Sequence, residues 1–105
     1  MTRSTALEGR RTHKAEFVLR LYLSSAAPMS ARAVVNTRAF CERHLAGRYD
    51  LEILSISDNI ELAAQDQVVA APMLVKLFPL PHRRFIGDMS NPDRLLDGLG
   101  LRDTE

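Results

Sequence analysis

Few side chains in this sequence of 105 residues could carry nucleophilic, redox or metal chemistry. There is one cysteine, Cys41, and the three histidines are His13, His44 and His82. A single thiol cannot close an internal disulfide, and thioredoxin-type exchange needs a second cysteine close by. The histidines lack the spacing of a metal site, and no Gly-rich phosphate loop is present. The sequence therefore predicts no enzyme, no metal site and no cofactor.

The one thiol lies in a stretch with helical periodicity, residues 30–46. Val34, Cys41 and Leu45 fall on the apolar face of this predicted helix, so we expect Cys41 to be a small core residue. Gly47 directly follows the stretch and is a typical helix terminator. The redox interpretation thus depends on a cysteine that the pattern places in the core.

The elements around this helix follow from alternation, helical spacing and turn residues. Residues 58–67 begin with Asp58 and have Glu61 three positions on, which predicts a capping box. In chain order we predict strand 16–23, helix 30–46, strand 49–56, helix 58–67, strands 73–78 and 83–86, and a last helix starting at Pro92. The order β-α-β-α-β-β-α is typical of a single α/β domain with a thioredoxin-like fold. Residues 1–15 are predicted to be a disordered tail before a domain at 16–101.

Composition excludes several classes of function. The formal net charge of +1 gives no electrostatic basis for a nucleic-acid partner. No apolar run approaches the roughly 20 residues of a membrane helix. Cysteine usage indicates a reducing compartment, and a cytoplasmic location is expected.

The stretch 69–91 contains a specific combination of motifs. It holds Ala71-Pro72-Met73-Leu74, then Pro79-Leu80-Pro81, then Arg83-Arg84-Phe85-Ile86-Gly87-Asp88-Met89-Ser90. Upstream come Leu19-Arg20-Leu21-Tyr22 and Pro28-Met29-Ser30-Ala31-Arg32-Ala33. In order and spacing these pieces resemble the bacterial clock protein family KaiB, over about residues 17–99.

The resemblance implies a regulatory protein without catalytic activity. Members of this family bind the N-terminal ATPase ring of the timing ATPase KaiC, and they switch between two folds. One is a thioredoxin-like monomer that binds the ATPase, and the other is a different α/β arrangement that assembles as tetramers. The segment that refolds corresponds here to about residues 58–99. The partners implied are therefore a KaiC-type ATPase hexamer and the protein itself, as a dimer or tetramer.

The resemblance also implies positions for the site residues. Partner contacts are expected at Arg38, Glu52, Gln67, Arg83 and Arg84. Glu52 and Gln67 replace lysines that are common in cyanobacterial members, which implies a divergent member adapted to its own ATPase or to another target. Residues expected to act in a switch or hinge are Pro72, Pro79, Pro81, Gly87 and Asp88.

Two other interpretations remain open at this point. The chain could be a thioredoxin-fold redox or stress-response adaptor that uses Cys41 and has a different partner. It could also be a stand-alone regulator related to the sensor domains of histidine kinases, which share the fold. The sequence does not distinguish a circadian oscillator from a simpler timer or stress pathway.

Overall fold

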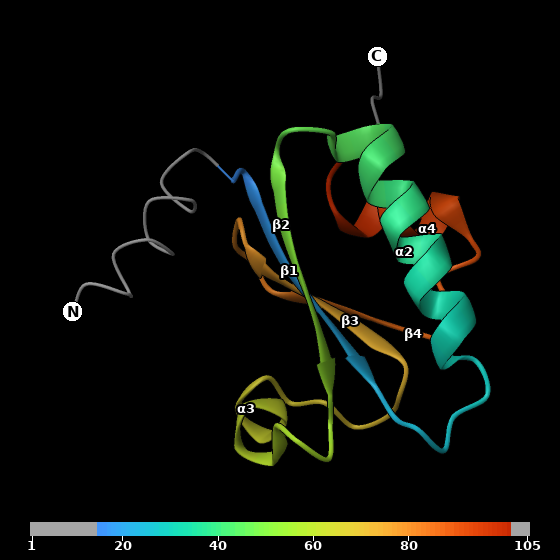
Figure 1. Ribbon diagram of the computed structural model, residues 1–105. Coiled ribbons are helices and arrows are strands. Elements are labelled where there is room, and N and C mark those ends of the chain that lie inside the picture. Colours follow the sequence, from blue (N-terminus) through green and yellow to red (C-terminus); the bar gives the residue numbers. More distant parts are fainter. Residues whose placement is uncertain (1–14, 102–105) are drawn as a thin grey trace.

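A four-stranded mixed sheet forms the centre of the computed structural model, which describes residues 15–101 (Figure 1). The strand order is β2-β1-β3-β4, with β1 parallel to β2 and antiparallel to β3, and β4 antiparallel to β3. The elements are β1 (Phe17–Leu23), α2 (Ser30–Leu45), β2 (Tyr49–Ser55), α3 (Ile60–Gln65), β3 (Met73–Phe78), β4 (Arg83–Ile86) and α4 (Pro92–Gly98). The central strand β1 therefore joins the two halves of the chain.

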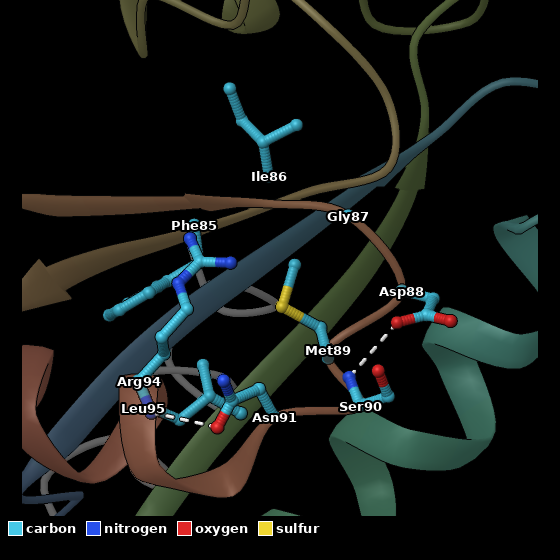
Figure 2. Close-up of a pocket in the computed structure, with 9 residues that line it drawn as sticks. All are labelled: Phe85, Ile86, Gly87, Asp88, Met89, Ser90, Asn91, Arg94 and Leu95. Atoms are coloured by element: carbon cyan, nitrogen blue, oxygen red, sulfur yellow. Dashed lines mark hydrogen bonds between the residues drawn. The ribbon is translucent and has the colours of Figure 1, made fainter.

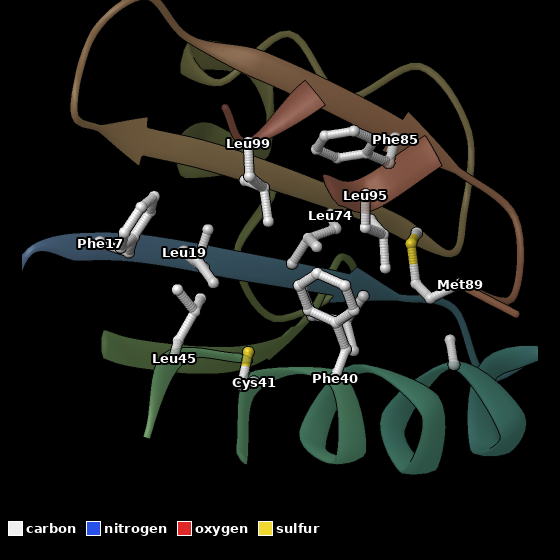
Figure 3. Packing of buried hydrophobic residues seen from close by; sticks show 12 residues of the cluster. Phe17, Leu19, Phe40, Cys41, Leu45, Leu74, Phe85, Met89, Leu95 and Leu99 are labelled. Carbon is white, nitrogen blue, oxygen red and sulfur yellow. The ribbon is translucent and has the colours of Figure 1, made fainter. Parts of the chain in front are cut away.

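Helices cover both faces of this sheet, with α2 and α4 on one face and the short α3 on the other (Figure 1). This follows from the sequence of β1, because both of its faces carry apolar side chains. On the α2/α4 face, Phe40 and Leu95 pack with Leu19 and Leu74 (Figure 3). On the α3 face a smaller apolar cluster is formed by Tyr22, Ala63, Met73 and Val75.

The predicted α/β fold of the thioredoxin-like class is confirmed, and each predicted element is present. Pro92 occupies the first turn of α4, and the Asn91 side chain accepts hydrogen bonds from the backbone N–H groups of Asp93 and Arg94. The predicted capping box of α3 is wrong. Its cap residue is Asn59, whose side chain makes no capping bond and donates to the backbone carbonyl of Ser55 instead. The predicted tail lies outside the described residues, apart from Ala15.

Candidate protein-interaction surface

Three of the five predicted contact residues lie together on the α3 face of the sheet. Glu52 points from β2, Arg84 points from β4, and Gln67 follows the end of α3. Arg83 is the neighbour of Arg84 in a strand, so its side chain lies on the opposite face. Arg38 is exposed on α2, on that opposite face as well. The structure therefore places Glu52, Gln67 and Arg84 on the same side of the sheet, with Glu52 and Arg84 on its two edge strands, and places Arg38 and Arg83 on the other side.

A hydrogen-bonded cluster around Asp66 connects these residues. Its members, called the Asp66 cluster below, are Arg20, Tyr22, Glu52, Asp66 and Arg84. The Arg20 guanidinium donates through Nε to Glu52 Oε1 and through NH1 to Asp66 Oδ2, each at 2.9 Å. The Tyr22 hydroxyl donates to the same Asp66 oxygen at 2.5 Å, and Arg84 Nε donates to the Asp66 backbone carbonyl at 2.9 Å. The cluster thus joins β1, β2, β4 and the end of α3.

Sheet geometry explains how these side chains meet. Arg20 and Tyr22 are two residues apart in β1 and therefore point to the same face. Arg20 is directly opposite Glu52 in the β1–β2 register, where oppositely charged cross-strand pairs are favourable. Asp66 lies at the end of α3, on the side of the sheet to which Arg20 and Tyr22 point. The chain turns back there, because the Val68 N–H donates to the Ala63 carbonyl.

The end of α3 requires an unusual backbone conformation next to Asp66. Gln67 has φ of 61°, in the left-handed region that glycine occupies more readily than other residues. Its N–H donates to the carbonyl of Ala64, so the last turn of α3 is closed by hydrogen bonds of the type common after helices. The conformation keeps Asp66 buried while the Gln67 side chain is exposed.

Tyr22 and Arg20 both keep their protons near neutral pH. Burial, together with the hydrogen bond to Asp66, raises the pKa of Tyr22 to about 12. Burial opposes the charge on Arg20, but hydrogen bonds to Asp66 and Glu52 outweigh it and raise the pKa of the guanidinium. Neither group can exchange a proton usefully at pH 7. These two side chains are therefore suited to positioning their charged partners and not to acid–base chemistry.

The predicted hinge residues lie around β3 and β4. The peptide bonds before Pro72, Pro79 and Pro81 are all cis. Gly87 has φ of 118°, and its N–H donates to the Pro72 carbonyl at 3.0 Å, which links two of the predicted hinge residues. Pro79 and Pro81 lie in the turn between the two strands.

The loop after Gly87 is held against α2. Asp88 Oδ1 accepts from the Ser90 N–H, Arg32 NH1 lies 3.5 Å from Asp88 Oδ2, and the Asn36 side chain donates to the Asp88 carbonyl at 2.8 Å. The hydrogen bonds from Ser90, followed by those of Arg32, lower the pKa of the Asp88 carboxyl. A small cavity of about 90 Å³ is present at this corner, lined by residues of β4, the loop and α4 (Figure 2).

Cys41 lies in the core, as predicted, between α2 and the sheet (Figure 3). Burial, with a smaller contribution from Glu42, raises the pKa of its thiol to about 12. His44 packs its ring against Phe40, and His82 is exposed in the β3–β4 turn, whereas His13 lies outside the described residues. In residues 15–101, no group of three or more histidine, cysteine or acidic side chains could hold a metal ion. None of the described helices is long and apolar enough to span a membrane.

Sequence patterns did not identify Arg20, Tyr22 and Asp66 as site residues. The first two could have been found, because their alternation on β1 places a cation and a phenol on the face that Glu52 shares. Asp66 had no such signal, since a single acidic residue at the end of a short helix is ordinary. Asn36, which holds the loop at Asp88, was also missed, because one amide side chain within a long helix gives no signal of a contact with a distant loop.

Comparison with known proteins gives consistent results. A family model described as the KaiB domain matches residues 20–101. The circadian clock oscillator protein KaiB of Thermosynechococcus vestitus is 39% identical over 85 residues, which cover 81% of this chain and 79% of that protein. The protein of the same description from Synechococcus elongatus is 38% identical over 85 residues, which cover 81% of this chain and 83% of that protein.

Solved structures with the same fold are more distant in sequence. A thioredoxin of Fasciola hepatica superposes with a TM-score of 0.68 at 17% identity, covering 92% of this chain and 91% of that one. The N-terminal domain of SasA from Synechococcus elongatus superposes with a TM-score of 0.66 at 19% identity, covering 85% and 88%. At these identities the likeness shows the fold alone.

Proposed function

Because this chain belongs to the KaiB family of circadian clock proteins, we propose that it is a non-catalytic clock or timer regulator that binds a KaiC-type ATPase hexamer. The observation that carries the proposal is the family match over residues 20–101, which includes every member of the Asp66 cluster. A regulatory role in timing is what the described relatives share. The ATPase as partner is the finer part of the proposal and requires a test.

The contact surface in this proposal is centred on the Asp66 cluster. Glu52 and Arg84 are exposed, but Glu52 is held by the half-buried Arg20 and Arg84 by the buried Asp66, so they present charges with little loss of side-chain entropy on binding. Gln67 adds an exposed amide at the position that follows Asp66 in the chain. Arg83 extends this surface around the edge of β4, and Arg38 would be reached only by a partner that also contacts α2.

The replacements at two positions support a partner different from that of cyanobacterial relatives. Glu52 brings a negative charge where a lysine is common, and here it forms an ion pair with Arg20. Gln67 is neutral at the second position. A partner evolved for lysines at both places would meet one like charge and one lost charge, which weakens association. The ATPase encoded with this protein is therefore the appropriate binding partner to test.

Control by oligomer state and by refolding of residues 58–99 is the second part of the proposal. That segment contains β3, β4 and α4, which supply Leu74, Phe85 and Leu95 to the apolar cluster on the α2/α4 face. Gly87 and Asp88 are the proposed hinge, because the backbone there already departs from strand geometry. Association stabilises whichever arrangement it selects.

The redox alternative is not favoured by any structural observation. A thiol whose pKa is raised to about 12 is almost entirely protonated at neutral pH, and the protonated form is a poor nucleophile. Replacing Cys41 with serine tests this alternative directly. Unchanged partner binding and unchanged cellular function in the Cys41→Ser variant would rule it out.

The decisive experiment for the proposed function is size-exclusion chromatography with light scattering. The protein is measured alone, and then with the KaiC-type ATPase encoded in the same genome, with ATP or ADP. We expect a free oligomer that dissociates and co-elutes with the hexamer. A protein that stays apart from the hexamer with either nucleotide would contradict the proposal.

Substitutions on the surface sharpen this test. Arg84→Glu should weaken co-elution at least about tenfold, because it reverses an exposed charge at the proposed contact. The matched control is Arg43→Glu, an equal charge change at an exposed position of α2 outside the proposed surface. Circular dichroism of both variants verifies the fold. Equal loss of binding in the two variants would show that net charge, and not the Asp66 cluster, governs association.

A further inference from the structure

The outer edge of β4 is an unpaired sheet edge within the described part of the chain, since β4 is the last strand in the order β2-β1-β3-β4. Hydrogen bonding to β3 fixes which groups point outward. The Gly87 N–H donates to the Pro72 carbonyl, so these two residues form a hydrogen-bonded pair. Bonded and non-bonded pairs alternate along an antiparallel ladder. The backbone N–H and C=O groups of Arg84 and Ile86 therefore point away from β3.

The side chains of the same two residues lie on the α3 face. Arg84 is opposite Val75 and Ile86 is opposite Met73 in the β3–β4 register. Ile86 is 49% exposed, which is high for a large apolar side chain in a strand. In Figure 2 it points away from the side of β4 that carries Phe85. The edge thus offers a cation and an apolar side chain, two residues apart, beside free backbone donors and acceptors.

The two adjacent arginines Arg83 and Arg84 give this edge strand positive charge. Among the described residues, neither Arg83 nor Arg84 forms an ion pair with a carboxylate. Arg84 is also oriented in advance, because its Nε is held by the Asp66 carbonyl, while its two terminal nitrogens form no hydrogen bond within residues 15–101. A guanidinium with a fixed orientation suits bidentate binding of a carboxylate.

We propose that β4 receives an extended acidic segment of the partner as an added strand. In that segment a carboxylate faces Arg84, and an apolar side chain two positions away contacts Ile86. Main-chain hydrogen bonds to Arg84 and Ile86 complete the ladder. The inference rests on the proposed function, because the segment belongs to the KaiC-type ATPase.

A second copy of this chain fits the edge poorly. Pairing of β4 with β4 of another copy would place the arginines of both strands close together. Like charges across a strand pair are destabilising, and cationic residues on short edge strands are a common means of preventing self-association. The same charges favour an acidic strand.

Residue-resolved hydrogen exchange in the complex tests this proposal. The full-length protein is exposed to D₂O alone and in complex with the ATPase hexamer, and exchange is then quenched and read amide by amide. We expect the amides of Arg84 and Ile86 to exchange at least about tenfold more slowly in the complex. The Phe85 and Gly87 amides point toward β3 in this fold, so their protection in the free protein verifies that both measurements are made on the same fold.

Each result has a distinct meaning. A complex that forms without slower exchange at Arg84 and Ile86 would overturn the added strand and leave the proposed function intact. Absence of any complex would overturn both. Protection of Arg84 and Ile86 that increases with protein concentration in the absence of the ATPase, while Phe85 and Gly87 keep the protection of this fold, would identify a second copy as the occupant and would also overturn the proposal.

Charge reversal provides a second measurement. Arg84→Glu should reduce the protection of the Ile86 amide in the complex, and Arg84→Lys should retain part of it, because lysine keeps the charge without the fork of a guanidinium. Arg43→Glu on α2 is the control and should leave the exchange at β4 unchanged. Protection of Ile86 that is the same in all three variants would show that the arginine does not recruit the segment.

Discussion

Within residues 15–101, Asp66 accepts more hydrogen bonds than any other residue of the Asp66 cluster. Its carboxylate receives the Tyr22 hydroxyl and the Arg20 guanidinium, and its carbonyl receives Arg84. Only 9% of the residue is exposed, so water cannot replace these partners. Asp66 is therefore a positioning residue for Glu52 and Arg84, which a partner would contact.

Replacing Asp66 with alanine should destabilise the protein by about 2–3 kcal/mol, because the buried Tyr22 hydroxyl and one Arg20 contact lose their acceptor. Urea unfolding measures the loss. Asp58→Ala, at an exposed position before α3, is the matched control and should change stability by less than about 0.5 kcal/mol. In a double-mutant cycle, Tyr22→Phe should cost much less in the Asp66→Ala background. If the stability losses of Tyr22→Phe and Asp66→Ala simply added, the result would contradict a hydrogen bond between the two side chains.

Lys76 is a buried cation on β3 without an ion-pair partner among the described residues. It is 4% exposed, and its cross-strand neighbour in β4 is Arg83, also a cation. Burial and the charge of Arg83 lower the pKa of the Lys76 ammonium. Folding therefore brings a charged group into an unfavourable environment. An apolar side chain at this position would make the fold more stable than Lys76 does.

Lys76→Met should stabilise this fold at pH 7 by about 1 kcal/mol or more, because it removes a buried charge and keeps the side-chain volume. The folded-state pKa lies below the unfolded value of 10.5, so the unfolded chain binds more protons between the two values. Stability of the unmodified protein should consequently rise as pH increases through that window. The advantage of the variant should shrink over the same range, which urea titrations at pH 7 and pH 10 measure.

The control for this prediction is Arg43→Met, which removes a cation from an exposed position of α2 and should have little effect at either pH. An advantage of Lys76→Met that stays constant with pH would show that the gain comes from packing and not from the charge.

At the scale of elements, α4 depends on a close approach to β4. A Cβ added at Gly98 would overlap the tip of the Phe85 ring, with Cζ at 2.5 Å. Phe85 is buried between β4 and α4, so its ring has little room to move. Glycine at this position therefore allows the helix to pack against the strand, although glycine is a poor helix residue.

Gly98→Ala should lower the free energy of unfolding by about 1–2 kcal/mol, because the overlap costs more than the gain in helix propensity. Phe85→Leu removes the ring atoms that the new methyl group meets. In the double variant, the loss of unfolding free energy should be smaller than the sum of the losses in the two single variants, as measured by thermal or urea unfolding. A stabilised Gly98→Ala variant would indicate that the ring moves aside without cost.

The elements were largely predictable from the sequence, and the site was predictable only in part. Alternation in β1 and the Asn91-Pro92 start of α4 are local signals, and local signals place elements well. The prediction of a capping box at α3 was wrong because the Asn59 side chain binds the Ser55 carbonyl. This contact depends on how the preceding turn folds. The Asp66 cluster was missed because Arg20 and Asp66 are 46 positions apart and meet only through the sheet.

At the scale of the whole molecule, the core on the α2/α4 face is shared between the two halves of the chain. Phe40 and Leu45 come from the N-terminal half, whereas Phe85, Leu95 and Leu99 come from the C-terminal half. If residues 58–99 refold, as proposed, the apolar face of α2 loses these partners. A contiguous apolar face that is exposed to water favours association. Oligomer formation and refolding are therefore expected to be coupled in this protein.

The position of β1 in the sheet has a mechanical consequence. Pairing between β1 and β2 lies wholly within the N-terminal half, and pairing between β3 and β4 lies wholly within the C-terminal half. In the described sheet, only the β1–β3 ladder crosses from one half to the other, and it carries an irregularity between Val18 and Leu19. The two halves of the sheet can thus separate by breaking the β1–β3 ladder alone, while the β1–β2 and β3–β4 pairs stay intact. Residues that face each other across this ladder, such as Leu21 and Leu74, determine the free energy that holds the two halves together.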